Sequence, residues 1–243
     1  MANILKYAVD TYKNNIYLIS LFSISFIIAF LILIFASLPT YSDAGGIFLR
    51  MQSLFYNMNW LNTSIIIIAV LLSLLFLSFA IVAINVIVKH SRTSTKITRE
   101  VIKGLELYTA KVFIVLLLFT IIFGLISFIN YLLGVSSLLS SLIILVLTPF
   151  FFYTPSSIVI DDLRIVRAMN MSARFFITRF HYFLLWLVIA IILVSVFDFI
   201  FIAISGTFLS RFIMFIFNSL FILPFLVVLQ SQSYMNRFSL LKR

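Results

Sequence analysis

The chain contains no cysteine, and its 243 residues include only two histidines and seven acidic residues. The absence of cysteine excludes disulfides, iron–sulfur clusters, thiolate zinc sites and cysteine nucleophiles. The two histidines, His90 and His181, lie far apart in the sequence, whereas a metal site usually needs three or four ligands. Patterns typical of nucleotide-binding loops, zinc hydrolases and serine hydrolases are also missing. We therefore expect a protein that is not an enzyme and that holds no cofactor or metal.

Charge is scarce as well, because charged residues make up 10% of the chain and hydrophobic residues make up 64%. Soluble domains carry about 25% charged residues, and a soluble protein could not hide so much apolar surface. We therefore expect an all-α polytopic membrane protein with a single integral domain over residues 1–243. The net charge of +10 then reflects basic residues that face anionic lipid headgroups, not a nucleic-acid partner.

Six stretches are long and apolar enough to cross a membrane, which takes about 20 residues of helix. They lie at about 16–38, 64–88, 112–133, 138–153, 182–204 and 208–229. Pro149 lies within the fourth stretch and Pro224 within the sixth, and each proline should kink or break its helix. A tight turn at residues 205–207 should join the fifth and sixth stretches.

The positions of the basic residues predict the orientation of these spans. With six spans and the N-terminus inside, all but two of the 17 Lys and Arg residues fall on inner segments. The two exceptions are Arg50 and Arg211. Because basic residues collect on the cytoplasmic side of membrane proteins, we expect a protein of the cell membrane with both termini in the cytoplasm.

Three inner segments, at about 2–14, 96–108 and 161–180, have the spacing of amphipathic helices. In the third, an apolar stripe through Leu163, Val166, Met169, Ala173, Phe176 and Phe180 opposes the basic residues. Basic amphipathic helices of this kind usually lie in the headgroup plane. Each of these segments precedes a pair of spans. The chain therefore contains either three copies of one repeated unit, or three unrelated helices that need the same spacing of apolar and basic residues. The candidate lipid-headgroup contacts are Lys96, Arg99, Lys103, Arg164, Arg167 and Arg174.

The longest outer loop runs from Pro39 to about Asn62. Residues 43–46 (DAGG) predict a turn. Apolar residues then recur with helical spacing from Ile47 to Met58, which predicts a short helix lying on the outer membrane surface.

A few polar residues fall inside the predicted spans, where a charge is expensive to bury. Asp198 lies in the fifth span, and Arg211 follows near the start of the sixth. We expect the two to form a structural ion pair that locks the last hairpin, with a proton or ion site as the alternative. Asn218 and Asn85 are the other intramembrane candidates, and hydrogen bonding between helices is the simplest role for them.

Residues 155–162 read PSSIVIDD, and Ile165, Val166, Arg167, Ala168, Met169 and Ser172 follow. This pattern resembles an element in a loose group of polytopic membrane proteins. The group includes the membrane domain attached to some glycerophosphoryl diester phosphodiesterases and several families of unknown function. The enzymatic members carry a separate catalytic domain that this sequence lacks, so the resemblance implies a membrane module without hydrolase activity.

Two functions remain as hypotheses. The leading one is a non-enzymatic membrane module that binds lipids, or assembles with partner proteins, through its basic inner helices. The alternative is a transporter or permease subunit with a polar path near Asp198, Asn218 and Asn85. A lipid-filled lateral groove would favour the first, and a polar central cavity reaching Asp198 would favour the second.

Overall fold

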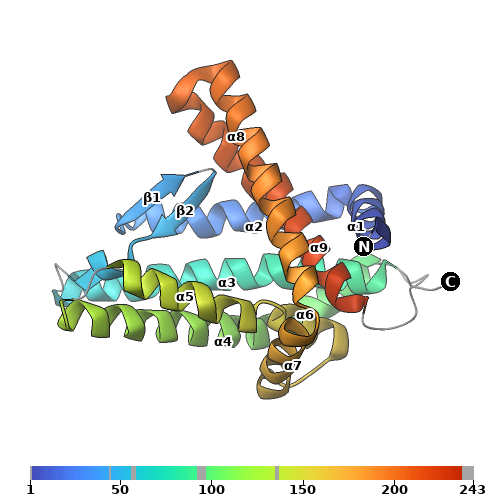
Figure 1. The fold of residues 1–243 in the computed structure, drawn as a ribbon, viewed down its shortest axis with the longest axis horizontal. Helices are drawn as coiled ribbons and strands as arrows, with labels where there is room; N and C mark the ends of the chain where they lie inside the picture. Colours follow the sequence, from blue (N-terminus) through green and yellow to red (C-terminus); the bar gives the residue numbers. More distant parts are fainter. Residues whose placement is uncertain (1, 44, 56–58, 92–96, 135–136, 237–243) are drawn as a thin grey trace.

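The computed structural model describes the chain apart from residues 1, 44, 56–58, 92–96, 135–136 and 237–243. It is 88% helical, which confirms the predicted all-α class. In chain order, the elements in Figure 1 are α1 (Ala2–Asn14), α2 (Ile16–Phe35), β1 (Thr40–Asp43), β2 (Gly46–Leu49), the 3₁₀ helix η1 (Met51–Phe55), α3 (Trp60–His90), α4 (Ile97–Leu132), α5 (Ser137–Phe151), α6 (Thr154–Asp161), α7 (Ile165–Thr178), α8 (Phe180–Phe217), the π-helix η2 (Asn218–Ile222) and α9 (Leu223–Met235).

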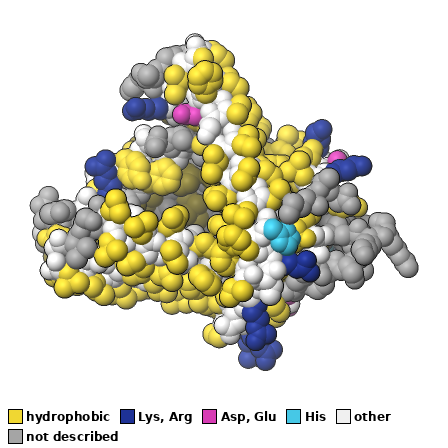
Figure 2. Space-filling view, viewed as in Figure 1, with side chains coloured by type: hydrophobic (Ala, Val, Ile, Leu, Met, Phe, Trp, Pro, Cys, Tyr) yellow, Lys and Arg dark blue, Asp and Glu magenta, His cyan; other side chains and the backbone are white. Residues whose placement is uncertain are grey.

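Within the described part of the chain, six helices are long and apolar enough to cross a membrane, as predicted. They are Ile16–Phe35, Trp60–His90, Arg99–Leu132, Ser141–Asp161, Phe180–Ile204 and Leu209–Met235. Several extend beyond the predicted limits, because apolar runs end at the first polar residues whereas helical hydrogen bonding continues past them. Figure 2 shows hydrophobic side chains over most of one face of the molecule.

The centre of the fold is formed by α2, α3 and α4, which lie side by side (Figure 1). Residues 82–88 of α3 are each at most 1% exposed. Next to them α4 approaches closely at Gly104, where an added Cβ would lie 2.5 Å from Cγ2 of Val86. The second half of α3 is therefore the core on which the surrounding helices pack.

The first third of α4 differs from the separate interfacial helix predicted over 96–108. The backbone is helical without a break from Ile97 to Leu132. Val101 and Tyr108, two residues on the apolar face of this amphipathic segment, are buried at 1% and 8% exposure. Because Gly104 lets α4 approach Val86, this stripe packs on α3 and holds the segment in line with the span.

The other two segments predicted as interfacial helices do form separate helices, α1 and α7. α1 packs on α9 through a face that includes the buried residues Ile4 and Ala8. At this contact the Gln232 side-chain amide donates a 3.0 Å hydrogen bond to the Thr11 hydroxyl. α7 is bounded by non-helical backbone at Arg164 and Arg179.

The fourth predicted span is built from two helices, and it continues past the predicted end at residue 153 to Asp161. α5 ends at Phe151, two residues after Pro149, and α6 begins at Thr154 with Pro155 in its first turn. A proline inside a helix removes a backbone hydrogen bond and clashes with the preceding turn, whereas the first turn tolerates proline. The predicted break is therefore confirmed.

The fifth and sixth spans form a hairpin. The ring centroids of Phe197 and Phe217 lie 4.6 Å apart, although a straight helix would separate them by about 30 Å. Figure 1 shows the α8 ribbon turning back on itself, and the backbone is helical through the predicted turn at 205–207. Pro224, which cannot donate a backbone hydrogen bond, follows a π-turn in which the Leu223 amide donates to the Asn218 carbonyl. Pro224 therefore widens the helix instead of ending it.

The outer loop is a β-hairpin, so the prediction of a surface helix over 47–58 is wrong. β1 and β2 pair antiparallel, with Thr40 opposite Leu49 and Asp43 opposite Gly46. Ile47 and Phe48 lie in β2, and Met51–Phe55 form the short η1, whereas residues 56–58 lie outside the described part of the chain. The predicted turn at residues 43–46 does form, with Gly45 at a φ of +73°. This turn reverses the chain before a helix can begin.

Candidate functional site

A groove of about 540 Å³ lies between α4 and the start of α7. Lys111, Arg164 and Arg167 line it together with the apolar side chains of Ile165 and Val166. We call it the basic groove, and we call the end of the molecule that holds α1, α7 and the first turns of α4 the basic end. The groove thus combines three cations with an apolar surface, and Arg164 and Arg167 were predicted headgroup contacts.

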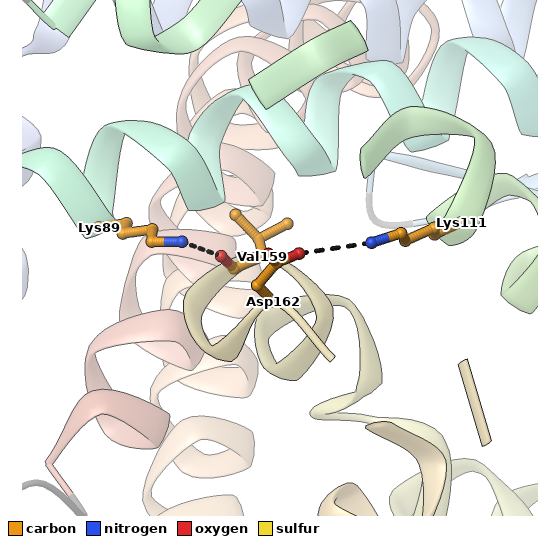
Figure 3. A network of polar contacts seen from close by, with 4 residues as sticks. All are labelled: Lys89, Lys111, Val159 and Asp162. Atoms are coloured by element: carbon orange, nitrogen blue, oxygen red, sulfur yellow. Dashed lines mark hydrogen bonds and ion pairs between the residues drawn. The ribbon is translucent and has the colours of Figure 1, made fainter. Parts of the chain in front are cut away.

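Two lysines fix α6 between α3 and α4 beside this groove (Figure 3). Lys111 Nζ lies 3.4 Å from Asp162 Oδ1, and Lys89 Nζ donates a 2.6 Å hydrogen bond to the Val159 carbonyl. Cations near the last carbonyls of a helix are favourable because the helix dipole is negative there. Asp162 follows the last residue of α6 at a φ of +52°. Its carboxylate neutralises part of the charge of Lys111.

The two arginines of the groove are free of such neutralisation. Among the residues that the structure describes, Lys111–Asp162 is the one ion pair. Arg164 and Arg167 are both exposed. Their guanidinium groups can therefore form bidentate contacts with a phosphate or carboxylate group.

α7 has three different faces. The face packed on α5 and α6 consists of Ala168, Ser172 and Phe175. Helical spacing places Val166 and Ile177, which are 70% and 67% exposed, on an open apolar face. Arg167 and Arg174 lie on an exposed basic face beside it. Of the predicted apolar stripe, Val166 lies on this open face, whereas Phe176 packs against Phe150 and Phe183. Leu163, at the start of the stripe, packs on the core.

Ser172 explains why small residues form the buried face of α7. Its hydroxyl accepts a 3.0 Å hydrogen bond from the Tyr153 amide and donates a 2.8 Å bond to the Phe150 carbonyl. Both backbone groups belong to the break between α5 and α6. α7 therefore satisfies backbone groups that the break leaves without helical partners.

Three of the remaining predicted headgroup contacts, Arg99, Lys103 and Arg174, do not line the basic groove. Arg99 and Lys103 are exposed on the first turns of α4, and Arg174 is exposed on α7. Lys96 lies outside the described residues. The structure therefore brings Arg164 and Arg167 together with Lys111, a residue that the sequence placed on an inner segment without assigning it a role.

A smaller crevice of about 180 Å³ lies where α3, α4, α9 and the α5–α6 break meet. It is lined by Ile81, Val115, Leu116, Phe119, Thr148, Phe151, Phe152, Pro155 and Gln230. Its two polar side chains already have partners: Thr148 donates to the Ile144 carbonyl, and Gln230 donates to the Phe152 carbonyl. We call it the apolar crevice. Sequence reasoning did not find it, and the prolines that predicted the break were the only signal.

Asn85 holds three helices together. It is fully buried on α3, and its side-chain oxygen accepts a 2.7 Å hydrogen bond from Ser231 Oγ on α9. Its side-chain amide donates to the Ile81 carbonyl at 2.8 Å. Ser231 Oγ also lies 3.4 Å from Ser156 Oγ on α6. Asn85 therefore has the interhelical hydrogen bond expected as its simplest role.

Asn218 joins the outer hairpin to the π-helix. It is 5% exposed, and its side-chain amide donates a 2.8 Å hydrogen bond to the Gly45 carbonyl. Its side-chain oxygen is buried without a hydrogen-bond partner. The amide contact is possible because Gly45 lacks a side chain: an added Cβ would lie 3.0 Å from Asn218 Cβ.

The predicted ion pair between Asp198 and Arg211 is wrong: neither side chain takes part in an ion pair among the described residues. Asp198 is half-buried, whereas Arg211 is exposed. On this limb Ser210 and Met214 are buried, at 1% and 0% exposure, whereas Arg211 between them is exposed. Asp198 lines neither the basic groove nor the apolar crevice.

These features define an all-α protein with six helices long and apolar enough to span a membrane, and with a cation-lined groove at its basic end. Comparison with protein-family models, curated proteins and solved structures finds no match to the chain. The resemblance to the membrane domain of glycerophosphoryl diester phosphodiesterases therefore stays a prediction that rests on the pattern within residues 155–172.

Proposed function

We propose that this chain is a non-enzymatic protein of the cell membrane whose basic end binds anionic lipid headgroups. The basic groove carries the proposal. It places Lys111, Arg164 and Arg167 around an apolar surface from Ile165 and Val166. An anionic membrane surface presents the complementary combination, with negatively charged headgroups next to apolar acyl chains.

The three faces of α7 support an interfacial position for this helix. One face packs on the protein, and Val166 and Ile177 expose apolar surface next to Arg167 and Arg174. A helix that lies in the headgroup plane buries an apolar face while its basic side chains reach lipid phosphates. In this arrangement the basic end faces the cytoplasm, because the positive-inside rule places basic residues there.

The orientation can be tested by cysteine labelling, since the natural chain contains no cysteine. Ser42→Cys on β1 should react with a membrane-impermeant maleimide added to intact cells. Asn170→Cys on α7 should react only after the cells are lysed. Both positions are exposed, so access to the reagent depends on the side of the membrane. Labelling of Asn170→Cys in intact cells would reverse the proposed orientation.

The lipid preference can be tested with the double variant Arg164→Gln/Arg167→Gln. Each basic residue near an anionic surface contributes about 1 kcal/mol, so loss of two should weaken the preference roughly 30-fold. The readout is the association of spin-labelled phosphatidylglycerol with the full-length protein in phosphatidylcholine bilayers, measured by electron paramagnetic resonance. High salt should reduce the difference between wild type and variant, because salt screens exposed charges.

The chain offers two controls for this experiment. Arg50→Gln/Arg211→Gln removes the same charge from residues outside the basic end and should leave the preference unchanged. Asp162→Asn removes the carboxylate beside Lys111 and should strengthen the preference. Equal losses in both arginine pairs would mean that net charge, not the basic groove, attracts the lipid.

A further inference from the structure

We propose that a single anionic phospholipid binds along α4, with its phosphate in the basic groove and an acyl chain in the apolar crevice. This inference rests on the proposed function and assigns it one binding site and one ligand class. The ligand is an amphiphile in which a phosphate and a hydrocarbon chain are joined through glycerol.

The geometry of α4 aligns the two sites. Lys111 lines the groove, and Val115 and Phe119 line the crevice. They follow one another at intervals of four residues, so they lie on the same side of the helix about 6 Å apart. The groove and the crevice are therefore successive positions along one side of α4.

Residues of α6 also lie next to both sites, in the same order along the helix axis. Pro155 in its first turn lines the crevice, and Asp162 after its last turn contacts Lys111. Seven residues of helix separate these positions by about 10 Å. One glycerophospholipid can span this distance, because only a few bonds separate its phosphate from its acyl chains.

The crevice has the chemistry of a site for hydrocarbon. Its polar side chains, Thr148 and Gln230, are already hydrogen-bonded to backbone carbonyls, and the other lining residues are apolar. Its volume of about 180 Å³ corresponds to roughly six water molecules. This is room for a segment of an acyl chain. Water would find few hydrogen-bond partners there.

The groove in turn has the chemistry of a site for a phosphate at a membrane surface. Arg164 and Arg167 supply forked donors without a competing carboxylate among the described residues. Val166 beside them is 70% exposed, which a soluble phosphate would not require. A phospholipid satisfies both the donors and the apolar surface.

Native mass spectrometry of the full-length protein, stripped of lipid in detergent, tests the ligand class. The probes are phosphatidylglycerol, phosphatidylcholine with the same acyl chains, and glycerol 3-phosphate. Phosphatidylglycerol should bind as one copy and at least tenfold more tightly than phosphatidylcholine. Glycerol 3-phosphate binding as tightly as phosphatidylglycerol would identify a site for free phosphate and overturn the lipid assignment.

Variants that fill the crevice test the position of the acyl chain. Leu116→Trp and Ile81→Phe should each weaken phosphatidylglycerol binding at least tenfold. Ile121→Trp is the matched control, because Ile121 is 49% exposed on another side of α4 and does not line the crevice. Thermal melting in detergent confirms that each variant is folded. Unchanged binding in a folded crevice variant would overturn the inference.

A fluorescence measurement tests the same point without filling the crevice. The indole of Trp186 lies beside the crevice, with its ring centroid 4.6 Å from that of Phe152. Trp60→Phe removes the other tryptophan and leaves Trp186 as the sole reporter. Phosphatidylglycerol with brominated acyl chains should quench Trp186, and brominated phosphatidylcholine at the same concentration should quench it less. Equal quenching by the two lipids would contradict a specific site.

The outcomes separate this inference from the proposed function. If Arg164→Gln/Arg167→Gln weakens phosphatidylglycerol binding but the crevice variants and the quenching show no effect, the headgroup function stands and the acyl-chain site is wrong. If the arginine variant binds like wild type, the proposed function fails and the inference fails with it.

Discussion

Replacing Gly45 with alanine should lower the free energy of unfolding by about 2–5 kcal/mol. Gly45 has a φ of +73°, and the left-handed conformation costs an alanine about 1–2 kcal/mol. The added Cβ would also lie 2.8 Å from both Cγ and the backbone oxygen of Met214. Overpacking of this kind typically costs another 1–3 kcal/mol. The effect is measurable by SDS-induced unfolding of the purified protein in mixed micelles.

Gly134→Ala is the matched control for this prediction. Gly134 has a similar φ of +65°, but no atom lies within 4 Å of an added Cβ, so this variant should show only the backbone cost. Met214→Ala in the Gly45→Ala background should recover part of the loss, because it removes Cγ and leaves the backbone oxygen in place. Equal losses at Gly45 and Gly134 would show that the turn does not dock against α8.

The class of fold follows from the sequence because apolar runs of about 20 residues allow few other structures. The number of spans follows for the same reason, and the break follows because Pro149 lies inside a helix, where it removes a backbone hydrogen bond. The continuity of α4 does not follow from the sequence, because amphipathic spacing cannot distinguish a helix that faces a membrane from one that packs on a neighbouring helix. That choice depends on Gly104, whose contact with Val86 joins residues on different helices. The outer hairpin was not predicted, because the spacing of its apolar residues fits a helix as well as a strand.

The candidate site was predictable in part. Arg164 and Arg167 could be identified because basic residues beside an apolar stripe indicate a membrane surface. The contact of Lys111 with Asp162 joins residues far apart in the sequence, and so does the crevice between four segments. The pairing of Asp198 with Arg211 was wrong because the spacing of two residues across a turn does not set the direction in which their side chains point.

The second large effect is expected at Asn85. Asn85→Ala should lower the free energy of unfolding by about 2–3 kcal/mol, because it removes the interhelical bond from Ser231 and leaves a cavity in the core. The readout is again SDS-induced unfolding. Asn170→Ala is the control, since Asn170 is exposed on α7 and its loss should change stability by less than about 0.5 kcal/mol.

A double-mutant cycle with Ser231→Ala separates the hydrogen bond from the cavity. Hydrogen bonds between membrane helices contribute about 0.6 kcal/mol on average and up to about 1.7 kcal/mol. We expect a coupling energy in this range, because Ser231 Oγ donates directly to Asn85 at 2.7 Å. A structural role for Asn85 requires both the loss of stability in Asn85→Ala and the coupling energy with Ser231→Ala. An Asn85→Ala variant as stable as wild type would instead mean that Asn85 does not hold the helices together. The transport path through Asn85, Asn218 and Asp198 would then become the better explanation of these polar residues.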